Sequence, residues 1–313
     1  MGRGRRPRTA SRSRLTRATV VASAGPSVWT PLRIQSDLLA WYDATHASTV
    51  VPPVGGLPSV ESWRDKTPLL NHLEQTVSAN QPQYNATAMN GMPGIVFDGS
   101  NDALRSNPAN YPGWPQNPNG EPMPFAVFYI CKPPPFAGFP TSNVRPWSGF
   151  HRSIGGTNQT YTFDYWVYGG NPNPVGIIGV VGGLLGGGLD TFGADYTVYS
   201  GAGTPKHPSG LWLNGTVFNG TTTLLRRTYG STVGSSVGSA TAGQLHGLCL
   251  GADGNGGTPS LHSATTFGEF IVVRNANAAT QSVWERIEGY LAWKWGVQGG
   301  LPVGHPYKTE PPR

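Results

Sequence analysis

The sequence predicts an all-β protein, an antiparallel β-sandwich or jelly roll with one C-terminal α-helix packed on it and an extended N-terminal arm. Gly (44) and Pro (29) are abundant among the 313 residues, whereas charged residues make up only 12%. This composition favours turns over helices, because exposed helix surfaces are usually built from Glu, Lys and Arg. About ten to thirteen short apolar segments also follow one another at regular spacing, as in β-sandwiches.

The first 28 residues differ from the rest of the chain in charge. No acidic residue precedes Asp37, and the 15 basic residues outside the arm nearly balance the 16 acidic ones. The basic residues of the arm are Arg3, Arg5, Arg6, Arg8, Arg12, Arg14 and Arg17. With few bulky apolar residues, the arm is not expected to fold by itself. Three interpretations are open: a disordered tail, a mitochondrial transit peptide, and an arm that binds nucleic acid or another acidic surface.

Neither a secretory signal nor a membrane span is expected. The apolar stretch 20–24 is too short for the hydrophobic region of a signal peptide, and no stretch approaches the roughly 18 apolar residues of a transmembrane helix. We therefore divide the chain into a basic arm and linker (1–28), a folded domain (29–308) and a short tail (309–313).

Short apolar or alternating segments predict the strands. The strongest is 125–131 (FAVFYIC), which is dominated by β-branched and aromatic residues. The other expected strands are 38–43, 60–66, 95–97, 160–168, 195–199, 209–217, 221–229, 245–251 and 267–274. Between two apolar runs, Asn214-Gly215 predicts a type I′ hairpin turn. The Gly-rich stretch 169–188 lacks the spacing of a phosphate-binding loop and is expected to be an apolar loop or a loosened strand.

One segment near the C-terminus has helical periodicity. Its apolar face consists of Trp284, Ile287, Leu291 and Trp295. Ser282 and Glu285 have the spacing of a capping box, and Gly296 suits the left-handed residue that ends a helix. A single helix with such an apolar face is marginal in water. We therefore expect it to cover one face of the sandwich.

The two cysteines, Cys131 and Cys249, lie in separate apolar segments. Two cysteines could form one disulfide, but this setting favours buried free thiols. The sequence does not indicate an oxidising compartment.

A polar turn at 98–102 is the best candidate for a metal site. Asp98, Asn101 and Asp102 offer oxygen ligands of the kind that Ca²⁺ binds. The alternative, which we favour, is a turn in which these side chains hold their own backbone. No other cofactor is expected, since the seven His residues do not form a zinc-binding pair and no Gly-x-Ser-x-Gly segment accompanies them.

Three separated segments resemble the concanavalin A-like, laminin-G-like jelly-roll domains found in phage structural proteins and bacterial secreted proteins. They are LAWYDATHAST followed by VESWRDKT, then NGMPGIVFDGSNDALRS, and finally the ending that contains IEGYLAWKWG and HPYK. The resemblance covers 29–308, tight at both ends and loose between about 107 and 241. It implies two antiparallel sheets and, in many members, glycan binding. It does not imply catalysis.

The acidic residues give no catalytic arrangement. Glucanases of this superfamily carry Glu-x-Asp-x-x-Glu on one strand face, and this motif is absent here. Glu61 and Asp65 come closest, and we interpret them as a solvated strand edge. The chain is therefore not expected to be an enzyme, although a glycoside hydrolase with unusual carboxylates remains a third reading.

Aromatic residues in predicted loops are the candidates for contact with sugars. Tyr111, Trp114, Trp147 and Phe150 could stack on sugar rings. They could equally anchor their loops or contact a neighbouring subunit.

Together these features favour a non-enzymatic virion structural protein, a capsid decoration or tail-associated jelly roll. The basic arm would anchor it to other virion proteins or to nucleic acid, its loops could bind host-surface glycans, and it would act as a homo-oligomer without a membrane partner. The alternative is a free or cell-surface bacterial carbohydrate-binding or adhesion protein.

Overall fold

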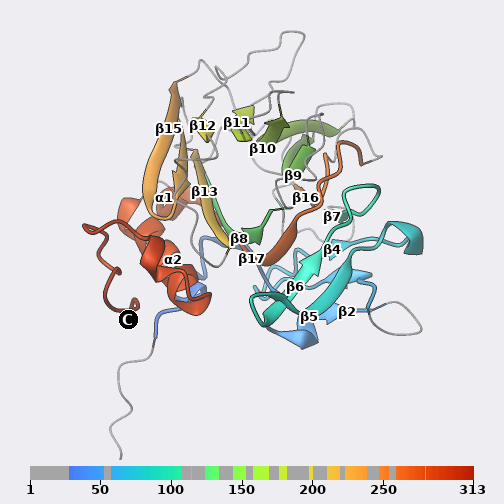
Figure 1. Cartoon of the computed structure of the whole chain (residues 1–313), viewed down its shortest axis with the longest axis horizontal. Helices are drawn as coiled ribbons and strands as arrows, with labels where there is room; N and C mark the ends of the chain where they lie inside the picture. The colour runs from blue at the N-terminus through green and yellow to red at the C-terminus, as the bar shows by residue number, and fades with distance from the viewer. Residues whose placement is uncertain are drawn as a thin grey trace, which may run out of the picture.

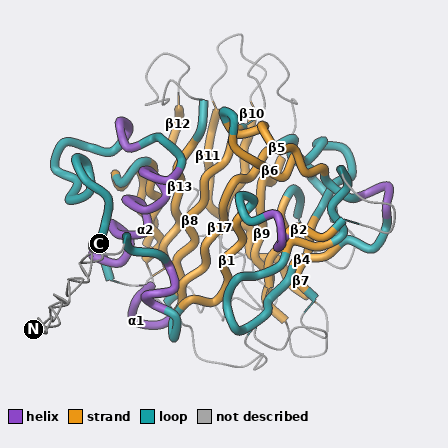
Figure 2. The backbone as a smooth tube through the Cα atoms, turned by 90° about the horizontal axis from the view of Figure 1, so that it is seen from below, coloured by secondary structure: helices purple, strands orange, loops and turns teal. Residues whose placement is uncertain are grey.

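In the computed structural model the chain folds into two stacked antiparallel β-sheets, with one long helix against the outer face of one sheet (Figures 1 and 2). The described residues are 28–52, 58–107, 114, 124–133, 144–152, 158–168, 176–181, 197–199, 210–218, 223–237, 247–253, 259–278 and 280–313. The predicted β-sandwich with one C-terminal helix is therefore confirmed. The basic arm and its seven arginines lie outside the described residues.

The first sheet holds eight strands in the order β15-β14-β13-β8-β17-β6-β5, with β1 also paired to β17. Its strands are β1 (Leu38–Asp43), β5 (Gln83–Met89), β6 (Met92–Val96), β8 (Phe125–Lys132), β13 (Trp212–Phe218), β14 (Thr223–Thr228), β15 (Ser231–Val237) and β17 (Thr266–Arg274). The second sheet has nine strands in the order β12-β11-β10-β9-β16-β7-β4-β3-β2. Its strands are β2 (Val50–Val51), β3 (Ser62–Trp63), β4 (Leu73–Glu74), β7 (Leu104–Ser106), β9 (Val144–Arg152), β10 (Asn158–Tyr168), β11 (Gly176–Val181), β12 (Thr197–Tyr199) and β16 (Gly247–Leu250).

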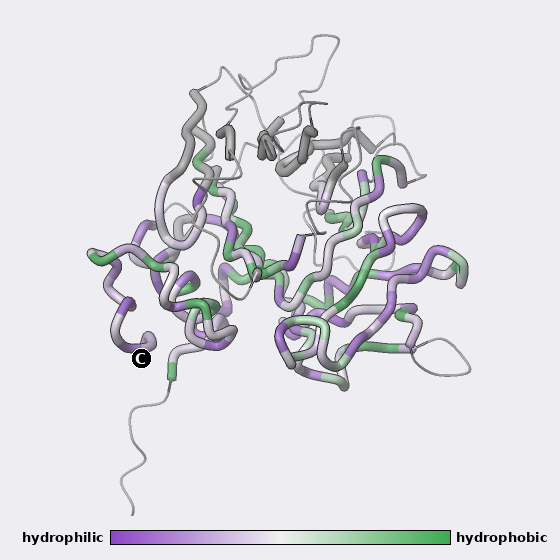
Figure 3. The backbone as a smooth tube through the Cα atoms, in the orientation of Figure 1, coloured by the Kyte–Doolittle hydropathy of each residue, from purple (hydrophilic) through white to green (hydrophobic). Residues whose placement is uncertain are grey.

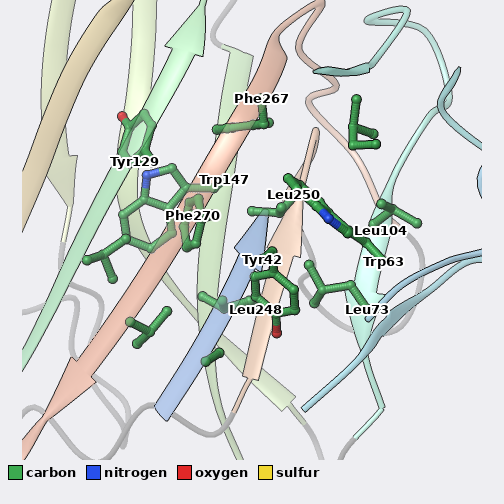
Figure 4. Packing of buried hydrophobic residues seen from close by; sticks show 14 of the residues in the cluster. Tyr42, Trp63, Leu73, Leu104, Tyr129, Trp147, Leu248, Leu250, Phe267 and Phe270 are labelled. Carbon is green, nitrogen blue, oxygen red and sulfur yellow. The ribbon is translucent and has the colours of Figure 1, made fainter. Parts of the chain in front are cut away.

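Large aromatic side chains fill the space between the two sheets. Tyr129 on β8 stacks on Phe270 of β17, and Trp147 of β9 packs edge-on against both rings. Trp63 and Leu73 extend this core toward the short strands of the second sheet (Figure 4). Figure 3 shows the hydrophobic stretches running along the strands, with hydrophilic residues along the outer loops. The strand predicted at 125–131 is confirmed as β8 and is buried along its length up to Cys131.

A second apolar layer lies between the first sheet and helix α2 (Gln281–Lys294), which follows the short helix α1 (Asn275–Ala278). The four residues of the predicted apolar face, Trp284, Ile287, Leu291 and Trp295, are all buried. Gly268 permits close packing, because a Cβ there would lie 2.4 Å from the Trp295 ring. The expectation that the helix covers the sandwich is confirmed.

The start of the helix differs from the predicted capping box. The N-cap is Thr280, which makes no side-chain capping bond, and Ser282 is already the second helical residue. Glu285 instead accepts a hydrogen bond from Gln281, four residues earlier. The helix therefore begins earlier than the predicted capping box would place it. Its end is as expected, since Gly296 has φ of 68°.

The hairpin predicted at Asn214-Gly215 is wrong. Both residues lie in the middle of β13, which pairs with β8 on one side and with β14 on the other. Gly215 lies directly opposite Phe128, and a Cβ on Gly215 would lie 2.6 Å from the Phe128 ring. The glycine thus makes room for a neighbouring aromatic ring, a role that only the strand pairing reveals.

The C-terminal residues strap the chain back onto the domain. Lys308 donates hydrogen bonds to the carbonyls of Gln298, Gly299 and Leu301. The Trp29 backbone N–H donates to the carbonyl of Pro312 at 2.9 Å. The point where the arm joins the domain therefore lies beside the C-terminal residues and α2 (Figure 2).

Candidate functional site

A groove of about 690 Å³ lies over the short strands β2, β3 and β4, at the end of the second sheet. It is lined by eight polar residues and two apolar ones, Val51 and Leu70; the polar residues are Thr49, Glu61, Ser62, Arg64, Asp65, His72, Glu74 and Thr76. The volume is within the range of about 300 to 1,000 Å³ that is typical of small-molecule sites.

Strand register explains why these residues lie together. Val51, Ser62 and Glu74 are successive cross-strand partners, and residues opposite one another point to the same face of a sheet. Their strand neighbours are the buried core residues Val50, Trp63 and Leu73. The row that includes Ser62 and Glu74 must therefore face away from the core.

Asp65 shapes the loop at one side of the groove. Its carboxylate accepts backbone N–H bonds from Trp41, Thr67 and Asn71, together with the Thr67 hydroxyl at 2.5 Å. Burial raises the pKa of Asp65, although these hydrogen bonds oppose the shift. The expectation of a solvated strand edge is therefore wrong for Asp65, which is only 5% exposed. The turn that it organises also ends β3 after Trp63, short of the predicted 60–66.

The loop held by Asp65 presents an apolar side chain over the polar groove. Leu70 is 55% exposed and has φ of 57°, a left-handed conformation that is strained for a residue of this size. Two backbone bonds fix it, from Leu70 N–H to the Thr67 carbonyl and from His72 N–H to the Leu70 carbonyl. The groove therefore has one apolar rim among polar walls.

His72 lies on the same wall as a neutral ring. Its Nδ1 accepts the Asp65 backbone N–H at 3.1 Å, so Nδ1 carries no proton in this arrangement. Burial, followed by the charge of Arg64, lowers the pKa of His72. Arg64 is therefore the main positive charge among the groove residues.

Four polar groove residues have side chains that are not used by the fold. Within the described part of the chain, no hydrogen bond or ion pair involves the side chains of Glu61, Ser62, Arg64 and Thr76. These groups supply both hydrogen-bond donors and an acceptor to a ligand.

A second polar cluster lies under the end of α2. Asp43 and Glu269 are direct cross-strand partners on β1 and β17, and both are fully buried. The extra residue at Gly268 forms a bulge in the pairing with β8 and turns Glu269 toward the helix. Lys294 lies 2.8 Å from an Asp43 oxygen and 2.7 Å from a Glu269 oxygen, and Lys66 lies 2.8 Å from Asp43.

The charges of this cluster are fully compensated. Burial alone would raise the pKa of Asp43, but the charge and hydrogen bond of Lys294 and the hydrogen bond of Lys66 hold it well below its usual range. The Glu269 carboxylate also accepts bonds from the Trp41 and Trp295 indole N–H groups, and burial raises its pKa. Both acids are enclosed under α2, so we infer that this cluster holds the helix on the sheet.

No protein-family model and no curated protein matches this chain. Solved structures that are similar include a sialidase of Trypanosoma rangeli, with 11% identity and a TM-score of 0.45 over 83% of this chain and 33% of that chain. Domain 4 of AbnA, a GH43 extracellular arabinanase from Geobacillus stearothermophilus, has 12% identity and a TM-score of 0.38 over 79% of this chain and 98% of that chain.

The binding domain of Paraclostridial Mosquitocidal Protein 1 has 12% identity and a TM-score of 0.44 over 82% of this chain and 52% of that chain. This chain thus spans about a third of the length of the sialidase and about half of the mosquitocidal binding domain. All three TM-scores are below 0.5.

The turn at 98–102 holds its own backbone. The Asp98 carboxylate accepts the backbone N–H groups of Ser100, Asn101 and Asp102, and Asp102 accepts that of Asp98. The Asn101 amide donates to the carbonyl of Ala79. These bonds confirm the polar turn. Among the described residues, no three His, Cys, Asp or Glu side chains are placed to hold a metal ion.

Two of the four aromatic residues considered for sugar stacking are core residues. Trp147 is 0% exposed and Trp114 is 1% exposed, so the expectation that these rings lie on the surface is wrong. Trp147 is buried because it belongs to β9 and faces the opposite sheet, not a loop. Tyr111 and the side chain of Phe150 lie outside the described residues.

Cys131 and Cys249 are free and buried, as predicted. Burial raises the pKa of Cys249 to about 12.

In the described residues no helix has the length and apolar character needed to cross a bilayer.

Proposed function

We propose that this chain is a non-enzymatic structural protein of a virus particle, a capsid decoration or tail-associated protein whose lectin-like β-sandwich binds glycans on the host surface. In this proposal the basic arm attaches the chain to other virion proteins or to nucleic acid. The protein acts as a homo-oligomer in the particle.

The observation that supports this proposal is that the arm joins the domain at one end of the molecule and the groove lies at the other. The hydrogen bond between Trp29 and Pro312 sets the start of the folded domain beside α2. Strands β2 and β4, which carry the groove, lie at the other end of the molecule in both views (Figures 1 and 2). A protein arranged in this way can be fixed at one end while the other remains open to a ligand.

The positions of the acidic side chains favour binding over catalysis. Asp43 and Glu269 are enclosed by α2, and Asp65 is used to hold a loop. Glu61 and Glu74 lie half-buried among polar side chains. Glycosidases keep their general acid protonated by placing it in apolar surroundings, and Glu61 and Glu74 do not lie in such surroundings.

Deletion of residues 1–24 tests the attachment. We expect the shortened chain to fold, with an unchanged circular dichroism spectrum and melting temperature, and to be lost from purified particles after gradient sedimentation. Replacing the seven arm arginines with lysines serves as the control, because it keeps the charge that attracts nucleic acid and acidic surfaces. Normal incorporation of the shortened chain would refute the anchoring role.

The same gradients separate the proposal from its alternative. A full-length chain that binds glycans but never sediments with particles would be a free or cell-surface carbohydrate-binding protein. Turnover of a β-glucan by protein purified to constant activity would instead show a glycoside hydrolase.

A further inference from the structure

The groove over β2, β3 and β4 is a feature of the described surface that the fold itself does not explain. Its strands are only two residues long each, yet they carry a dense set of polar side chains on one face. Glu61, Ser62, Arg64 and Thr76 have no partner for their side chains within the described part. The groove therefore offers solvent-accessible hydrogen-bonding groups that the fold does not use.

We propose that this groove binds a neutral oligosaccharide, whose hydroxyl groups contact Glu61, Ser62, Arg64 and Thr76 while one apolar sugar face packs on Leu70. This inference rests on the proposed function in that it assigns the glycan site. It places the site on a sheet face and not on the loop aromatics considered from the sequence.

The mixture of donors and acceptors determines the class of ligand. A sugar hydroxyl both donates and accepts, so it can donate to the Glu61 carboxylate and accept from the Arg64 guanidinium. Ser62 and Thr76 hydroxyls can do either. A ligand with a single kind of polar group would leave part of this set unsatisfied.

The charge of the groove argues against ionic ligands. Glu61 and Glu74 oppose an anion, and His72 adds no positive charge because its Nδ1 accepts a backbone N–H. Arg64 in turn opposes a polycation. A neutral ligand meets neither repulsion.

Leu70 supplies the apolar contact that a sugar ring requires. Its exposed side chain lines the groove in a left-handed conformation that is strained for a non-glycine residue. The buried Asp65 carboxylate holds the loop in place through Thr67 and Asn71. The loop is therefore pre-formed, and little ordering is needed when a ligand binds.

Substitution of Leu70 by Gly separates binding from folding. Glycine adopts a positive φ without strain, so the melting temperature of Leu70→Gly should stay the same or rise. Loss of the apolar contact should weaken glycan binding at least tenfold. Leu261→Gly is the matched control, because Leu261 is also an exposed leucine with positive φ (52°) and lies outside the groove.

The probes are immobilised neutral glucan, galactan and arabinan oligosaccharides, with sialylated and sulfated oligosaccharides of similar length beside them. Full-length protein should bind at least one neutral probe, with weaker binding for Leu70→Gly, Arg64→Ala and Glu61→Gln and unchanged binding for Leu261→Gly. Melting temperatures show whether each variant is folded.

Three outcomes would overturn the inference. Binding that survives all three groove substitutions would place the glycan site elsewhere and leave the proposed function standing. Binding confined to the sialylated or sulfated probes would refute the neutral class. If no probe binds while the arm still directs the chain to particles, the groove is not a glycan site and only the anchoring part of the proposed function remains.

Discussion

At two strand positions a glycine is required because an aromatic side chain packs directly against its backbone. Gly215 in β13 lies under the ring of Phe128, its partner across the sheet, and Gly268 lies under Trp295. An aromatic ring packed on a strand glycine fills the volume that a side chain would otherwise take. These positions tolerate no larger residue, although nothing in their local sequence says so.

Gly215→Ala tests this packing. The new methyl group would lie 2.6 Å from the Phe128 ring, so the ring must move. We expect a loss of about 1–3 kcal/mol in unfolding free energy, as is usual for overpacked cores. Urea denaturation measures it, and Gly304→Ala is the control because no atom lies within 4 Å of its added Cβ. Equal stability of the two variants would contradict the packing role.

At the level of elements, α2 is held to the first sheet by packing and by charge together. Trp295 contributes to both, since its ring covers Gly268 and its indole N–H donates to Glu269 at 2.8 Å. Lys294, the preceding residue, links Glu269 to Asp43. The helix therefore buries two carboxylates and also supplies Lys294, the charge that offsets the cost of burying them.

Trp295→Ala should lower the unfolding free energy by about 3–5 kcal/mol, as other truncations of buried aromatic residues do. The substitution leaves a void next to Gly268 and removes the indole N–H that donates a hydrogen bond to the buried Glu269 carboxylate. Trp293→Ala on the same helix is the comparison, because Trp293 is only half-buried and should lose less. An unchanged melting temperature for Trp295→Ala would show that the helix is peripheral to stability.

Asp43→Asn tests the ion cluster. At neutral pH we expect a loss of about 3–5 kcal/mol, the usual effect of removing one partner of a buried ion pair. In the unfolded chain Asp43 takes up a proton near its ordinary pKa of about 3.9, whereas in the fold it does so only at lower pH. Its contribution is therefore present above pH 4 and is lost as the pH falls toward the folded-state pKa.

Urea denaturation of wild-type and Asp43→Asn protein at pH 7 and pH 3 measures this dependence. The difference between the two proteins should be smaller at pH 3. Glu310→Gln, at an exposed position near the C-terminus, should show little difference from wild type at either pH. A constant difference for Asp43→Asn would mean that its charge plays no part.

At the scale of the whole molecule, the fold separates two ends with different roles. The domain starts and finishes beside α2, where the ion cluster and the hydrogen bonds of the C-terminal residues also lie. The groove lies over the short strands β2, β3 and β4. Strands β2 and β4 are at the end of the molecule away from α2 (Figure 2). The arm and the groove can therefore be tested independently, by deletion of residues 1–24 and by Leu70→Gly.

Apolar periodicity and turn residues act locally, so they were sufficient to predict the sandwich, its strongest strands and the apolar face of α2. The sequence also indicated the free cysteines and the turn that Asp98 organises. The helix start and the role of Gly215 differ from prediction because packing across the sheet overrode a local signal. Trp147 was misplaced for the same reason, since its burial depends on the opposite sheet.

The positions of the polar residues could not be predicted from local patterns, because they depend on how the strands pair. Asp43 and Glu269 are far apart in sequence, and their contact exists because β1 and β17 pair in one register. The groove unites Val51, Ser62 and Glu74 through strands too short to show periodicity. A cross-strand pair brings together residues that no local pattern connects, so both the buried charges and the candidate ligand site follow from the pairing of the strands.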